Sequence, residues 1–262
     1  MSDSDSNDPQ PPAPPTPPAP PPPPSMAPPP GYVAYGDPDY RGAAALQRVG
    51  GLAKSISVLM MVLIPMTVIS ITVSFDVRSK ARKFLDGTIS ETQFKNSFGL
   101  TVLVGAVIGL ATLAAFVLTI IWMFRLAKNQ QALGRIGTWS PGWAIGGWFL
   151  PPCVLYVIPF LMMRDLWRSS DPQSGSDWKK NPVGSIVNIW WVLYGLVPVL
   201  FVSVTFSGTN LRSRSTVDAA KNLVKTFNVS TVSAIVQLGA GVAYLLLVRQ
   251  LTARHKQLIR ET

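Results

Sequence analysis

Four long stretches of the chain contain only apolar and uncharged residues. They cover residues 55–75, 100–123, 185–206 and 229–248. A helix rises about 1.5 Å per residue, so about 20 residues cross a hydrocarbon core of about 30 Å. The apolar residues are concentrated in these runs instead of being spread evenly, as they would be in a large soluble core. The pattern therefore predicts an all-α membrane protein with four transmembrane helices.

A fifth apolar stretch, residues 139–163, is irregular. An interior proline removes a backbone hydrogen bond and clashes with the preceding turn, at a cost of about 3 kcal/mol. Irregular backbone at membrane depth is tolerated where other protein segments shield it. We therefore expect a broken helical segment that is re-entrant or interfacial, and a fifth span is the alternative. The interrupting residues are Pro141, Gly142, Gly146, Gly147, Pro151, Pro152 and Pro159.

The Lys and Arg residues between the apolar stretches set the expected orientation, because cytoplasmic loops are enriched in them. If residues 139–163 do not cross the bilayer, 14 basic residues lie on one side and 9 on the other. If they cross, the division is 13 against 10. The larger bias favours four spans in the plasma (inner) membrane, with both termini in the cytoplasm.

The two loops on the opposite side each carry a helix signal. Ser90 and Gln93 have the spacing of a capping box, which predicts a short amphipathic helix starting there. Residues 217–227 (VDAAKNLVKTF) also have the pattern of an amphipathic helix. Both helices are expected to rest on the outer face of the membrane.

Residues 1–45 form a proline-rich segment, with sixteen of the 24 prolines among the first 40 residues. Such a segment buries too little apolar surface to offset its ordering entropy, and proline favours extended polyproline II geometry. We expect a disordered cytoplasmic tail without a cleavable signal sequence, because it has an acidic start and no early apolar core. Its PxxP spacings favour either a cytoplasmic protein partner with an aromatic groove or a plain solvated spacer.

The amino-acid composition limits the binding partners and the kinds of site that we expect. The net charge is +10, but the basic residues flank apolar runs, so we expect contacts with membrane lipids and not with nucleic acid. A single cysteine, Cys153, cannot form a disulfide within the chain, and one cysteine with a single histidine, His255, cannot build a zinc site. Cys153 is expected to be a small buried residue, and His255 a surface residue of a basic helix end. We expect no catalytic residues, no cofactor and no metal.

A distinctive set of polar and aromatic residues flanks the broken segment on its cytoplasmic side. Arg125 and Asn129 are four residues apart and share a helix face. Asp165 is expected to pair with Arg125 or Arg168, and the tryptophans to be interfacial anchors. The set either ties the broken segment to the preceding span or contacts an anionic headgroup or partner. Its members are Arg125, Asn129, Trp143, Trp148, Arg164, Asp165, Trp167 and Arg168.

The same region resembles a bacterial, mainly actinobacterial, membrane family known as domain of unknown function 4328. The resemblance rests on the run from Arg125 to Asn129, on Ser140-Pro-Gly-Trp-Ala-Ile-Gly146 with Trp148-Phe149 and Pro151, and on the run from Met163 to Ser169. It covers roughly residues 50–255 and implies a multi-helix membrane protein without an established activity. The family pattern has an asparagine where this chain has Val154, so any function of that asparagine is altered or lost.

These features favour a membrane-anchored interaction or scaffold protein that displays a proline-rich cytoplasmic tail, and not an enzyme. The spans contain no Asp, Glu, Lys, Arg or His, which counts against ion- or proton-coupled transport. Broken helices can nevertheless bind substrates. A small-molecule or lipid permease built around residues 139–163 is therefore the alternative. The sequence sets no oligomeric state.

Overall fold

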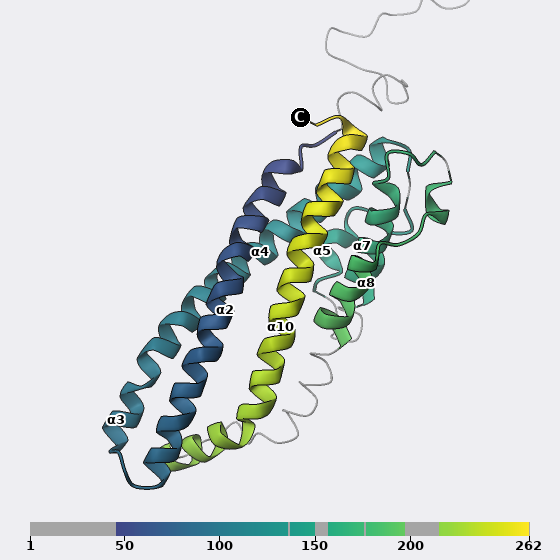
Figure 1. Cartoon of the computed structure of the whole chain (residues 1–262). Coiled ribbons are helices and arrows are strands. Elements are labelled where there is room, and N and C mark those ends of the chain that lie inside the picture. The colour runs from purple at the N-terminus through teal and green to yellow at the C-terminus, as the bar shows by residue number, and fades with distance from the viewer. Residues whose placement is uncertain (1–45, 136, 150–156, 176, 197–214, 262) are drawn as a thin grey trace, which may run out of the picture.

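A computed structural model describes residues 46–135, 137–149, 157–175, 177–196 and 215–261. Within these residues every regular element is helical (Figure 1). Three long helices, α2 (Gly50–Leu85), α4 (Phe98–Ala132) and α10 (Thr216–Ile259), form the bundle, and α2 packs against the other two. The start of α2 and the end of α10 lie at the same end of the bundle, here called the terminal end (Figure 1). The opposite end is called the loop end.

All three long helices are long and apolar enough to cross a membrane. They contain the predicted stretches 55–75, 100–123 and 229–248, and each continues beyond its stretch. The fourth predicted stretch, 185–206, is described only to residue 196. There, α8 (Ser185–Trp191) runs into a π-helical turn, η2 (Val192–Leu196). The remainder of that stretch lies outside the described residues.

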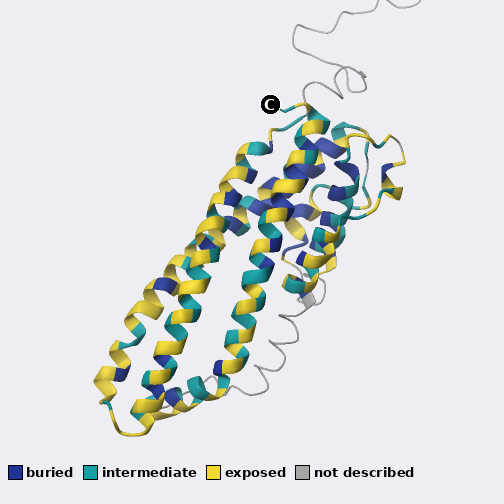
Figure 2. Cartoon of the chain, viewed as in Figure 1, coloured by how far each residue is buried: buried dark blue, intermediate teal, exposed yellow. Residues whose placement is uncertain are grey.

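The outer surface of the long helices is apolar, as a lipid environment requires. On α4, Val102, Leu103, Leu110 and Leu113 are between 61% and 72% exposed. Water-soluble monomers seldom expose contiguous apolar patches larger than a few hundred Å². The exposed apolar surface and the length of these helices are those of helices that can cross a membrane. Buried residues gather in the half nearest the terminal end, where the shorter helices pack on α4 and α10 (Figure 2).

The described residues of the broken segment form two separate helices. α5 (Trp143–Gly146) is a single turn, and α7 (Val157–Ser169) begins again with Pro159 in its first turn, where proline is tolerated. A short 3₁₀ helix, η1 (Trp178–Lys180), follows at the terminal end before α8. The predicted interruption of residues 139–163 is thus observed, although α7 continues six residues further. Pro151, Pro152, Cys153 and Val154 lie outside the described residues.

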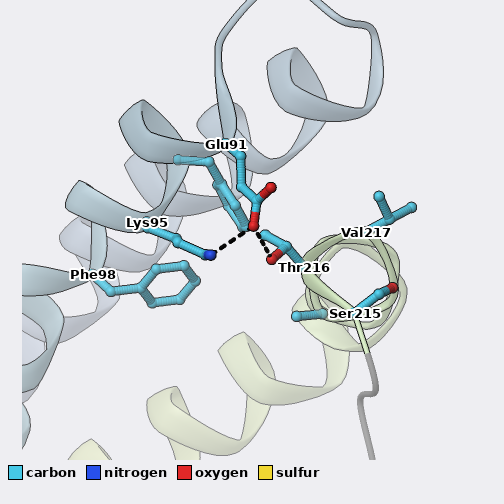
Figure 3. A pocket seen from close by; sticks show the side chains of 8 residues that line it. Glu91, Lys95, Phe98, Ser215, Thr216 and Val217 are labelled. Atoms are coloured by element: carbon cyan, nitrogen blue, oxygen red, sulfur yellow. Dashed lines mark hydrogen bonds and ion pairs between the residues drawn. The ribbon is translucent and has the colours of Figure 1, made fainter.

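At the loop end, the predicted capping box is confirmed. Ser90 and Gln93 exchange side-chain and backbone hydrogen bonds at the start of α3 (Glu91–Asn96). The second predicted helix is not separate, because residues 217–227 form the first turns of α10. Figure 1 shows these turns lying across the loop end before α10 turns along the bundle. Glu91 joins the two helices by accepting from Thr216 Oγ1 at 2.6 Å, and it also pairs with Lys95 of its own helix (Figure 3).

Candidate functional site

Asn129 is fully buried near the C-terminal end of α4 and holds the chain that leads into α2. Its Oδ1 accepts the backbone N–H of Gln47 at 2.6 Å, and its Nδ2 donates to the Gln47 carbonyl at 2.8 Å. One amide side chain therefore satisfies both backbone groups of a residue 82 positions earlier. Asn129 acts as a link between α4 and the start of the described chain.

The prediction that His255 is a surface residue is wrong. Its side chain is fully buried on α10, between Asn129 and Ser170. Its Nε2 lies 3.0 Å from Asn129 Nδ2, and its Nδ1 lies 3.1 Å from Ser170 Oγ. Asn129, Ser170 and His255, which are all fully buried, form what we call the buried polar network. It joins α4, α10 and the residues after α7.

The hydrogen bonds of this network fix the tautomer of His255. The backbone N–H of Gln47 can only donate, so the Asn129 atom that it contacts is the carbonyl oxygen Oδ1. The NH₂ group of Asn129 therefore faces His255. Nε2 therefore accepts, and Nδ1 carries the proton and donates to Ser170. His255 lies beyond the apolar part of α10, and its burial lowers its pKa to about 4, against a smaller opposing effect of Glu261. The imidazole is neutral at physiological pH.

The sequence contains a signal for this burial, but the charged residues on both sides of His255 point to exposure instead. His255 is flanked by Arg254 and Lys256, which is typical of an exposed helix end. However, Leu247, Leu251 and His255 are spaced by four residues and share one helix face. The two leucines are fully buried, and the histidine continues their stripe. Helical spacing could have placed His255 on the packed face.

The other predicted polar residues do not form an ionic cluster. Arg125 donates to the carbonyl of Arg48 at 3.0 Å, and the carboxylate of Asp165 accepts from the backbone N–H of Thr138 at 3.4 Å. Among the described ion pairs, Asp165 does not pair with Arg125 or Arg168, so that prediction is wrong. Arg164 and Arg168 each have a buried Nε without a hydrogen-bond partner in the described part of the chain.

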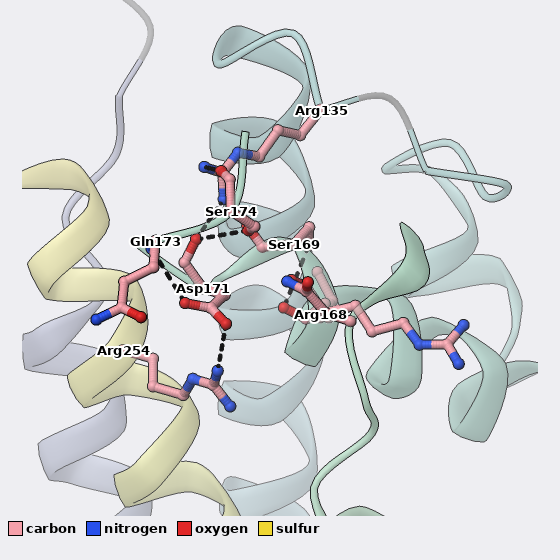
Figure 4. A network of polar contacts seen from close by, with 9 residues as sticks. Arg135, Arg168, Ser169, Asp171, Gln173, Ser174 and Arg254 are labelled. Carbon is pink, nitrogen blue, oxygen red and sulfur yellow. Dashed lines mark hydrogen bonds and ion pairs between the residues drawn. The ribbon is translucent and has the colours of Figure 1, made fainter. Parts of the chain in front are cut away.

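Two interactions that the sequence did not reveal hold the exit of the broken segment. Asp171 forms an ion pair of 3.0 Å with Arg254, whose guanidinium lies over the Trp167 ring (Figure 4). Arg135, which precedes the segment, donates to the carbonyls of Ser169, Asp171 and Ser174 after it. Figure 4 shows the Arg168 guanidinium pointing away from this network. Arg135 thus joins the entry and the exit of the segment at the terminal end.

The three predicted tryptophans have different environments. Trp143 is substantially exposed and makes an edge contact with Trp139, as an interfacial anchor would. Trp148 and Trp167 are buried, so the anchor prediction is wrong for them. Trp148 packs edge-on against Phe116 of α4, and Trp167 lies under Arg254. These two rings fasten the broken segment to the bundle.

Glu261, which follows α10, contacts the start of α2 at the terminal end of the bundle. The carboxylate of Glu261 accepts from the backbone N–H groups of Val49 and Gly50, at 3.0 and 3.1 Å, at the start of α2. A negative charge there satisfies orphan donors and complements the helix dipole. Across the described residues, no group of three or more His, Cys, Asp and Glu side chains could hold a metal ion.

A cavity of about 410 Å³ lies in the bundle between α2, α4, α8 and α10. Trp148 and Trp190 line it on the side of the shorter helices, while Tyr244 and Gly241 of α10 and Thr119 of α4 face them. Thr119 Oγ1 and Tyr244 OH are hydrogen-bonded to each other at 2.6 Å. Pockets that bind small molecules have volumes of about 300–1,000 Å³. The cavity is therefore large enough for a ligand.

A family model for a domain of unknown function matches residues 86–253 of the chain. The matched region starts after α2 and includes the broken segment, Asn129 and most of α10. It is shorter at its start than the region over which the motif residues suggested a resemblance. Neither the curated proteins nor the solved structures include a significant match. The chain belongs to the family of domain of unknown function 4328 (DUF4328).

Proposed function

We propose that the chain crosses the plasma membrane four times, with residues 139–163 re-entrant and the terminal end in the cytoplasm. The hydrogen bonds of Arg135 support this arrangement, because a segment that enters and leaves at one end of the bundle does not cross. The excess of basic residues on that side supports the cytoplasmic orientation.

Cysteine accessibility tests this topology. The only cysteine is Cys153, so Cys153→Ser gives a cysteine-free background. Into it we would introduce Gly175→Cys, Arg260→Cys or Asp86→Cys, all at exposed positions. A membrane-impermeant maleimide added to intact cells should label only Asp86→Cys, and all three after lysis. If Gly175→Cys and Asp86→Cys behave alike in intact cells, with both labelled or both protected, the re-entrant assignment is overturned.

We propose further that the protein is a non-enzymatic interaction protein that displays its proline-rich tail from this rigid end. The observation that carries the proposal is the attachment of the residues directly after the tail. Gln47 is bound by Asn129, and Val49 and Gly50 are bound by Glu261. These contacts fix residues 47–50 at the terminal end, which lies beside the cytoplasmic headgroups in the proposed orientation.

Deletion of residues 1–40 should abolish partner capture and leave membrane insertion intact. The measurement is a cross-linked pulldown from native membranes, comparing the full chain with the deletion variant. A variant in which every tail proline is alanine separates PxxP recognition from a simple spacer role. Recovery of the same proteins with and without the tail would refute this function.

The alternative, a small-molecule or lipid permease built around residues 139–163, is favoured by one observation. The cavity between the long helices is lined by Trp148 of this segment. If the protein is a permease, reconstituted vesicles should show substrate flux that Trp148→Ala lowers. Flux equal to that of empty vesicles would exclude transport of the compound tested.

A further inference from the structure

One face of α7 changes from apolar to basic along its length. Its residues recur at spacings that place them on the same side of a helix, and they are Val157, Leu161, Arg164 and Arg168. Val157 is 43% exposed, and the other three are half-buried. Leu166, on the opposite side of α7, is buried in the core. The basic residues therefore lie on the face of α7 that points away from the core.

The basic half of this face lies just outside the apolar part of the bundle. The carbonyl of Leu166, between the two arginines, accepts from Gln130 Nε2 of α4 at 3.3 Å. Gln130 lies about two turns, or about 10 Å, beyond the apolar stretch 100–123. Helical side chains tilt towards the N-terminus of their helix, and the N-terminal side of α7 faces the bilayer because its end lies beside His255. Both guanidinium groups can therefore reach the headgroup region, which adds about 5–8 Å to each side of the hydrocarbon core.

The two guanidinium groups have no partner among the described residues. Neither Arg164 nor Arg168 makes a hydrogen bond or an ion pair there. Only the Nε atom of each is buried, so the terminal nitrogens reach the molecular surface. Figure 4 shows the Arg168 guanidinium directed away from the polar network drawn there. The carboxylate of Asp165, next to Arg164 in α7, accepts from Thr138 instead. The terminal nitrogens of both arginines are thus available to an external anion.

A second basic element packs beside this face. The 3₁₀ helix η1 contacts α7, and Asn181 after it donates from Nδ2 to the carbonyl of Arg168 at 3.2 Å. Lys179 and Lys180 of η1 are both exposed. Lys180 forms a surface pair with Asp177, whereas Lys179 has no ion pair within the described residues. The surroundings of the two arginines therefore carry additional positive charge.

We propose that Arg164 and Arg168 bind the phosphate of an anionic phospholipid, whose acyl chains lie along Val157 and Leu161. A guanidinium group binds phosphate through two parallel hydrogen bonds, which suits a pair of arginines one turn apart. Lys179 adds positive charge beside the headgroup. A zwitterionic lipid has the same phosphate, but its ammonium group would add a further positive charge to this site. The site requires only that the helices lie in a membrane, so it does not depend on the tail role or on the orientation proposed above.

The probe is dioctanoyl phosphatidylglycerol, added to the full-length protein in a neutral detergent. A ligand that binds the folded state stabilises it, so we expect a saturable rise in Tm. Dioctanoyl phosphatidylcholine should raise Tm much less. Glycerol 3-phosphate, which has the phosphate but no acyl chains, should have no effect. An equal rise with glycerol 3-phosphate would identify a soluble phosphate ligand and overturn the assignment to a lipid.

Paired substitutions test the residues. Arg164→Gln combined with Arg168→Gln removes both guanidinium groups and should weaken the apparent Kd for phosphatidylglycerol at least about tenfold. The matched control is Lys54→Gln combined with Arg249→Gln, which removes the same charge from exposed positions that flank apolar stretches at the terminal end. The control should bind like the wild type. Equal affinities in the two double variants would show general electrostatic attraction only and refute the site.

Photo-crosslinking of the wild type keeps the test independent of how well the variants fold. The protein would be placed in phosphatidylcholine nanodiscs containing phosphatidylglycerol with a diazirine in one acyl chain, irradiated, digested and mapped by mass spectrometry. We expect labelling concentrated on the outward face of α7 and reduced by unlabelled phosphatidylglycerol. Labelling spread over lipid-facing residues such as Leu110 of α4, without enrichment on α7, would show bulk lipid contact only and contradict the proposal.

Discussion

Asn129→Leu is expected to lower the free energy of unfolding by about 3 kcal/mol or more. The substitution leaves the N–H and C=O groups of Gln47 without their partner and removes the donor to His255 Nε2. A buried polar group left unpaired costs about 1–3 kcal/mol, which applies in full to His255 and in part to the half-buried Gln47. Leucine has the branching of asparagine but a larger volume, so overpacking at this fully buried position adds to the loss of the hydrogen bonds.

The measurement is thermal unfolding of the purified protein in detergent, followed by circular dichroism. For a bundle of this size, 3 kcal/mol corresponds to a fall in the apparent Tm of about 6–12 °C. Gln131→Leu is the matched control, because Gln131 is exposed on the same helix. Surface changes of that kind usually shift stability by less than about 0.5 kcal/mol. Equal shifts for the two variants would show that the buried polar network does not stabilise the fold.

Acidification should destabilise the protein through His255. Its pKa is about 4 in the folded chain, against an ordinary value of 6.5 when exposed. Between these values the unfolded chain binds a proton that the folded chain does not, so stability is complete above pH 6.5 and falls as the pH drops towards 4. The expected loss over this window is about 3 kcal/mol. A proton on Nε2 would also oppose the Asn129 NH₂ group.

His255→Gln isolates this effect, since glutamine can still bond to Ser170 or Asn129 but does not titrate. The two charged groups that act on His255, Arg135 and Glu261, stay in place in both proteins. The measurement is chemical unfolding of the wild type and of His255→Gln from pH 7.5 to 4. The difference between the unfolding free energies of the two proteins should shrink by about 3 kcal/mol as the pH falls. Parallel curves would mean that His255 is exposed or already charged in the folded protein.

Helix formation could be predicted from the sequence because it depends on local pattern. The charge-free runs specified the long helices, since a helix satisfies its own backbone groups in hydrocarbon. The pair Ser90 and Gln93 specified the start of α3, because a capping box acts within one turn. The prolines and glycines of residues 139–163 specified a break, because each acts on its own backbone.

Only the tertiary structure decided which polar side chains meet. Asn129 and His255 are 126 positions apart, and Arg135 bonds to carbonyls more than 30 positions later. No local rule identifies such partners, because they depend on how the helices are packed. The flanking charges of His255 even predicted exposure, yet packing against α4 and the end of α7 buries it. The sequence by itself thus determined a helical membrane protein with a broken segment. The burial of His255, the hydrogen bonds from Arg135 to the carbonyls after α7 and the cavity beside Trp148 arise only from long-range packing.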